Sequence, residues 1–127
     1  MTALKKNIQK YHALLGEKRE QISQEIRLLE QEGRHDEANL AKVKLNIVNV
    51  FEAVAVSDEW AVSAEQSDTW RKFCERYIQR FSTLTKPWRE RLAQAKVHQD
   101  AEVVAVEEAK LETAAWIEKV FRSLEEK

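Results

Sequence analysis

The sequence predicts an all-α protein, and three observations support this. Only two glycines and one proline occur in 127 residues, too few for the many tight turns of a β-sheet protein. Apolar residues recur every three or four positions over long stretches, as on the buried face of a helix. The composition, 43% hydrophobic and 34% charged, suits amphipathic helices that share a core. We therefore expect an antiparallel four-helix bundle with a long C-terminal helix.

The length of the chain fits a single domain, residues 1–127, because most domains hold roughly 100–150 residues. No apolar run approaches the ~20 residues of a membrane span, and the segment from Met1 to Lys10 lacks the apolar core of a signal peptide. The lone Cys74 has no partner for an internal disulfide, which favours a reducing compartment. These features predict a cytoplasmic protein without a membrane segment.

The first helix is expected from Ala3 to Glu32. Its apolar stripe has members three, four or seven residues apart: Leu4, Ile8, Tyr11, Leu15, Ile22, Ile26 and Leu29. Gly33 suits the left-handed residue that follows a helix end, and Asp36 suits the N-cap of the next helix. A connection this short makes the two helices antiparallel neighbours.

The second helix is expected from Asp36 to Ser57. Its inner face holds apolar residues at helical spacing: Leu40, Val43, Ile47, Val50, Phe51 and Val54. Further apolar residues widen this surface near the end of the helix: Val48, Ala55 and Val56. This width indicates contact with more than one neighbour, or an interface. The mostly polar segment Ser57–Ser67 is interpreted as a connection in which Trp60 folds over the end of the bundle.

The third helix is expected to start at Ser67 or Asp68, either of which suits an N-cap, and to end before Pro87. Its stripe is the most aromatic in the chain: Trp70, Phe73, Cys74, Tyr77, Ile78, Phe81 and Leu84. Pro87 suits the first turn of a fourth helix. No glycine or proline follows it, so we expect one long helix from Pro87 to about Glu125. The polar run at residues 98–100 predicts a bend near residue 99.

Charge is distributed unevenly along the chain. Residues 69–98 carry eight Lys or Arg and two Glu, a net charge of +6, between two acidic flanks. Arg76 and Arg80 form a cationic ridge at i, i+4, and acidic positions on the first and fourth helices are their expected partners. Trp88 lies in the same basic segment, but the aromatic residues of this segment fall on the inward stripe. With a pI near 6.3, this pattern disfavours direct nucleic-acid binding.

Few residues are candidates for chemistry. Two isolated glycines cannot form a phosphate-binding loop, and Cys74 lies on an inward face without a neighbouring histidine. Asp100 and Glu107 lie seven residues apart on one helix face, where two carboxylates can bind a cation or a basic side chain. The alternative is that they are solvated or pair with Arg or Lys of the third helix. His98 is close in sequence but points away from Asp100 on a continuous helix. We therefore expect no catalytic residue, metal or cofactor, and no enzymatic activity.

Three hypotheses of function remain open. The favoured one is a protein that acts through helix–helix contacts with a partner or with itself, as a homodimer, because Trp residues are common binding anchors. The second is a bundle that binds a small ligand or a metal at Asp100 and Glu107. The third is a nucleic-acid-associated protein that uses the basic segment 69–98.

Overall fold

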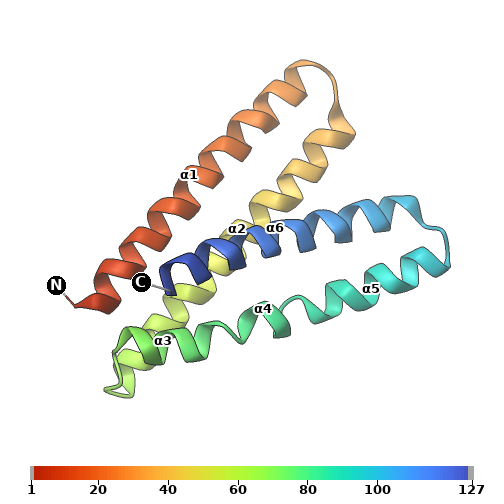
Figure 1. The fold of residues 1–127 in the computed structure, drawn as a ribbon. Coiled ribbons are helices and arrows are strands. Elements are labelled where there is room, and N and C mark those ends of the chain that lie inside the picture. Colours follow the sequence, from red (N-terminus) through yellow and green to blue (C-terminus); the bar gives the residue numbers. More distant parts are fainter. Residues whose placement is uncertain (1, 126–127) are drawn as a thin grey trace.

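Two helical hairpins form the protein, and Figure 1 shows them meeting near the two chain ends and diverging toward their turns. The computed structural model describes residues 2–125, which contain only helices. The helices are α1 (Ala3–Gln31), α2 (His35–Ala64), α3 (Trp70–Tyr77), α4 (Arg80–Thr83), α5 (Lys86–Val97) and α6 (Ala101–Glu125). In succession, α3, α4 and α5 form one segmented rod, so the chain passes through four rods of alternating direction. The predicted all-helical bundle with a long C-terminal helix is confirmed.

The turn between α1 and α2 forms as the sequence predicts. Gly33 has a φ of +74°, which a residue without Cβ adopts at no steric cost. The N–H of Arg34 donates to the carbonyl of Leu29 at 2.9 Å, which closes the end of α1. The predicted cap is wrong: α2 begins one residue before Asp36, and no side chain caps it.

The second helix is longer than its sequence pattern indicates. It continues without a break to Ala64, so the predicted connection over Ser57–Ser67 starts too early, and only its last three residues lie between α2 and α3. Trp60 lies on the outer surface of α2 with 75% of its area exposed, and it does not fold over the end of the bundle. The helix continues because its polar residues find partners on neighbouring helices, as described below.

The segmented rod also differs from the prediction. It starts at Trp70, and the preceding Thr69 is its cap, with a hydroxyl that accepts the N–H of Lys72 at 3.1 Å. Pro87 lies in the first turn of α5, as expected, but the chain does not reverse there. It reverses at Gln99, which has a φ of +55°.

The prediction of one continuous helix from Pro87 to Glu125 is therefore wrong. The predicted bend near residue 99 is a full turn that separates α5 from α6, and the two helices pack against each other as an antiparallel pair (Figure 1). Physically, the polar run at residues 98–100 lets the chain leave the helix where no apolar residue would hold it against a neighbour.

The core is centred where the hairpins meet and continues between α1 and α2 toward their turn, with Ile26, Leu29 and Ala38 buried there. It is built from α1, α2, α3, α4 and the second half of α6, with a cluster of buried aromatic rings at its centre: Tyr11, Phe51, Phe73, Tyr77, Phe81 and Phe121. The hydroxyls of Tyr11 and Tyr77 are 2.6 Å apart, and Tyr77 donates to the carbonyl of Phe51 at 2.8 Å. Burial raises the pKa of both phenols above their ordinary value.

Candidate interaction surface on helix α2

The structure does not bring together the residues predicted as a cation site. Asp100 is exposed before α6 and accepts the N–H of Val103 at 3.3 Å, so it caps that helix. Glu107 is buried between α5 and α6, where Arg91 lies at 2.9 Å and Lys110 at 3.0 Å. His98 is exposed at the end of α5. Within residues 2–125, no group of three or more His, Cys, Asp or Glu side chains is arranged to hold a metal.

Arg76 and Arg80 share a carboxylate of α2, Asp58, and do not pair with the first and fourth helices as predicted. Arg80 donates from Nε and Nη2 to the two oxygens of Asp58, at 3.1 and 2.7 Å. Arg76 adds a third hydrogen bond, from Nε to Asp58 Oδ1, at 3.1 Å. The bond to Asp58 raises the pKa of Arg80 above its ordinary value. These charge-assisted bonds compensate the burial of Asp58, which has no exposed area.

Most of the basic segment is neutralised in the same way. Five of its eight cationic side chains pair with carboxylates: Arg71, Lys72, Arg76, Arg80 and Arg91. Its aromatic rings are buried or half-buried, and Trp88 packs against the core with the ammonium of Lys110 5.8 Å from its ring centre. No exposed ring therefore accompanies the basic side chains as a platform on which a nucleic-acid base would stack.

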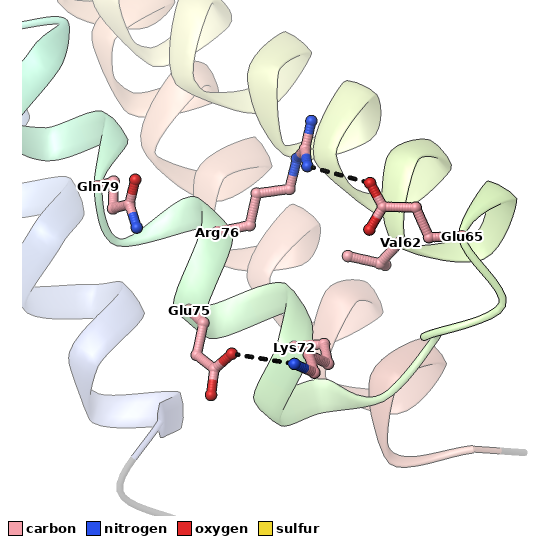
Figure 2. A pocket seen from close by; sticks show the side chains of 6 residues that line it. All are labelled: Val62, Glu65, Lys72, Glu75, Arg76 and Gln79. Atoms are coloured by element: carbon pink, nitrogen blue, oxygen red, sulfur yellow. Dashed lines mark ion pairs between the residues drawn. The ribbon is translucent and has the colours of Figure 1, made fainter.

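A shallow groove of about 280 Å³ lies between α2 and α3. Figure 2 shows that charged side chains of both signs line it. Arg76 reaches across the groove to Glu65 at 3.6 Å, and Lys72 lies 3.7 Å from Glu75 on its own helix. Because the two cations and two anions offset one another, this groove presents little net charge to a ligand.

The exposed surface of α2 between Asn46 and Ala64 has a different character. Eight residues of this stretch are exposed, and none of them is charged: Asn46, Asn49, Ala53, Val56, Ser57, Trp60, Ser63 and Ala64. We call these eight residues the α2 outer face. Most neighbours in this set are three or four residues apart, and the adjacent pairs Val56–Ser57 and Ser63–Ala64 fall on the same side of the helix as the rest. Trp60, at 75% exposed, and Val56, at 45%, are its large apolar members.

The carboxylates of the same stretch all lie beside this face or behind it, and each has a cationic partner. Glu52 contacts Arg19 and lies 3.0 Å from His12. Glu59 pairs with Lys5 at 2.8 Å, and Asp58 is held by the two arginines on the opposite side of α2. Consequently, the face is free of charge, and the charges along its α1 edge are compensated.

Two other features bear on the kind of chemistry the chain offers. Burial raises the pKa of the Cys74 thiol to about 12, which leaves it protonated and a weak nucleophile at neutral pH. Among residues 2–125, no helix combines the length and the apolar character that crossing a membrane requires.

In comparisons with known proteins, the chain matches no family model, no curated protein and no solved structure.

Sequence reasoning missed the α2 outer face because it ended the second helix at Ser57. With the helix extended to Ala64, the spacing of Ala53, Val56 and Trp60 reveals an outward stripe without charge. The local pattern could not justify that extension, because the partners of Asp58 come from α3 and α4.

Proposed function

We propose that this protein acts through helix–helix contact with a partner protein, without catalysing a reaction, and that the α2 outer face is its contact surface. The observation that supports this is the absence of charge from eight exposed residues around an exposed Trp60. Charged residues are depleted from the centres of interfaces, and Trp is the residue type most enriched among binding anchors.

The shape of the face indicates the kind of partner. A stretch of this length on a helix is roughly 28 Å long, at 1.5 Å per residue. Ala53, Ser57 and Ala64 are small and form a row beside Val56 and Trp60, so a second helix laid along this row approaches the backbone of α2 closely. We therefore propose that the partner contributes one helix with an apolar stripe.

The proposed location is the cytoplasm. The lone, buried Cys74 supports it, because a chain with one thiol gains nothing from an oxidising compartment.

The proposal is tested by adding a charge to the face. Trp60→Glu replaces the largest apolar side chain of the face with a carboxylate, and Ala13→Glu adds the same charge to an exposed position on α1. Each variant and the wild-type chain are purified from the native cell with an affinity tag, and the co-purifying proteins are quantified by mass spectrometry.

The amount of a specific partner that co-purifies should fall at least about tenfold with Trp60→Glu and stay at the wild-type level with Ala13→Glu. The reason is that an unpaired charge buried in an interface costs more free energy than the apolar contact of Trp60 contributes. Thermal unfolding of both variants checks that they fold equally well. An unchanged set of co-purifying proteins in the Trp60→Glu variant would contradict the proposal.

A further inference from the structure

The two hairpins diverge toward their turns (Figure 1), and a groove of about 470 Å³ lies between the start of α2 and the start of α6. Its apolar lining residues are only half-buried: Leu40, Val43, Ala105 and Val106. None of these four residues belongs to the buried core cluster. The groove therefore offers apolar surface that the folded chain does not cover.

Exposed carboxylates border this groove. Asp36 of α2 and Glu102 of α6 line it, and none of the described residues that line it is basic. Among residues 2–125, neither carboxylate forms an ion pair. Glu108 and Glu112 follow on the exposed side of α6, three and seven residues beyond Ala105, so they lie on the same side of the helix as this alanine.

The local excess of negative charge has two parts. Asp36 and Glu102 lie in the first turns of their helices, where the helix dipole stabilises a carboxylate. Glu108 and Glu112 lie beyond the first turn of α6, where this effect has faded. Lys96 lines a neighbouring groove between α5 and α6 together with Glu108, and it offsets one charge at most. This surface is acidic, although the net charge of the chain is only −1.

We propose that the groove between α2 and α6 binds a basic amphipathic helix of a partner protein. The apolar lining of the groove fits the apolar stripe of such a helix, and the carboxylates on its border fit Lys or Arg side chains on either side of that stripe. The walls of the groove are helices, whose backbone groups bond within each helix and leave no edge to which a strand could be added. Ala101 and Ala105, four residues apart on α6, allow the backbone of a docked helix to approach closely.

This site differs from the α2 outer face, which carries no charge, so the inference does not rest on the proposed function and either can fail alone. A second copy of the chain fits the groove less well, because five of the eight cations in its basic segment are already paired. Eight residues line the groove, fewer than the roughly 20–30 of a standard interface. We therefore expect a dissociation constant in the micromolar range.

A synthetic peptide serves as the probe. It has about 18 residues, or about 27 Å as a helix, with leucines at helical spacing, lysines on both sides of that stripe and a fluorescein label. Fluorescence anisotropy at low ionic strength measures its dissociation constant. A peptide with glutamate in place of lysine, and another with serine in place of leucine, should each bind at least about tenfold more weakly.

Variants of the protein test whether the peptide occupies the groove. Asp36→Asn/Glu102→Gln should weaken its binding about tenfold, because the lysines lose their partners. Glu17→Gln/Glu25→Gln, the same charge change at exposed positions of α1, is the matched control and should leave the affinity within about twofold of wild type. Ala105→Phe fills the groove without a change of charge and should also weaken binding. Thermal unfolding checks that all variants are folded at the assay temperature.

Four results would overturn the inference. The first is no binding of the lysine peptide up to about 1 mM. The second is an equal loss of affinity in the two double variants, because binding would then follow net charge and not the groove. The third is loss of affinity in Trp60→Glu, which would place the peptide on the α2 outer face. The fourth is self-association of the wild-type chain in sedimentation velocity that Ala105→Phe abolishes, which would identify a second copy as the occupant.

Discussion

Helix α1 and the second half of α2 lie side by side, yet they distribute polar and apolar residues in different ways. On α1, the buried residues are apolar, and eight of the fifteen exposed residues are charged. Between Asn46 and Ala64 of α2, none of the exposed residues is charged, an aspartate is fully buried and a tryptophan is exposed. Asp58 and Trp60 are only two residues apart, so the reversal of the usual pattern, with a charged residue buried and an aromatic residue exposed, is confined to a short stretch of α2.

The comparison distinguishes the residue pattern that a helix needs for folding, as on α1, from an additional pattern on the exposed side of α2. The pattern of α1 is sufficient for a helix that packs on one side and is solvated on the other. The pattern of α2 costs free energy on both sides, because a buried carboxylate loses its hydration and an exposed indole orders water. Departures from consistent patterning are expected where a protein functions, and this supports an interface on α2.

The largest effect should come from the buried charge of α2. Asp58→Asn removes the charge that Arg76 and Arg80 share, and we expect it to lower the free energy of unfolding by about 2–3 kcal/mol. The loss stays below the roughly 3–5 kcal/mol of fully buried pairs because both arginines are partly exposed and regain water. Glu59→Gln, which breaks the exposed pair with Lys5, should change stability by less than about 0.5 kcal/mol. Urea titration of both variants measures the contrast, and equal losses would show that burial does not distinguish the two carboxylates.

A second effect concerns the two buried phenols, Tyr11 of α1 and Tyr77 of α3. Tyr77→Phe leaves the Phe51 carbonyl and the Tyr11 hydroxyl without their partner, so we expect a loss of about 2 kcal/mol, against about 1 kcal/mol for Tyr11→Phe. Because burial raises the pKa of both phenols, stability should be full below the unfolded value near 10 and decline as the pH rises above it. Unfolding of wild type and of the double Phe variant at neutral and alkaline pH measures this. An equal decline in both proteins would rule out the tyrosines as its cause.

A smaller effect, of opposite sign, should appear where the two helices end. Gly33 follows α1 in the left-handed conformation, and Gln66 adopts the same conformation after α2, with a φ of +57°. Gln66→Gly should therefore raise the free energy of unfolding by about 0.5–1 kcal/mol, because a side chain in this region is strained. Gln99→Gly provides a second test at an equivalent turn, and thermal unfolding measures both. A loss of stability in both variants would contradict the strain.

The smallest effect on stability should come from the most exposed aromatic residue. Trp60→Gln removes a ring that is mostly in water, so the free energy of unfolding should stay within about 0.5 kcal/mol of wild type. Leu15→Ala, at a fully buried position of α1, should cost about 2–5 kcal/mol. If the two losses in a urea titration were similar, Trp60 would be packed against the protein and could not serve as an anchor for a partner.

The sequence predicted the parts of the fold that depend on local pattern. The apolar stripe of α1, the reversal at Gly33 and the place of Pro87 in a first helical turn all follow from spacing or backbone preference. The turn at Gln99 was missed because glutamine has no preference for positive φ, and the reversal depends on the contacts between α5 and α6. The extent of α2 was missed because Asp58 is compensated by residues far along the chain.

The candidate site was predicted less well, for the same physical reason. Asp100 and Glu107 share a face only on a continuous helix, and the turn at residues 98–100 makes one a cap and leaves the other buried. Arg76 and Arg80 form the predicted ridge, but it faces inward to Asp58. Of the residues predicted to widen the apolar surface of the second helix, Val48 and Ala55 are buried in the core, and only Val56 lies on the α2 outer face.

Site-specific cross-linking from the α2 outer face tests the central claim most directly. A photoreactive benzoylphenylalanine replaces Ser57 in one variant and Ala13 in another, and both are irradiated in the native cell. We expect a discrete cross-linked species from position 57, absent from position 13 and abolished by Trp60→Glu. If both positions gave the same cross-linked products, the α2 outer face would have no specific partner, and the central claim would be contradicted.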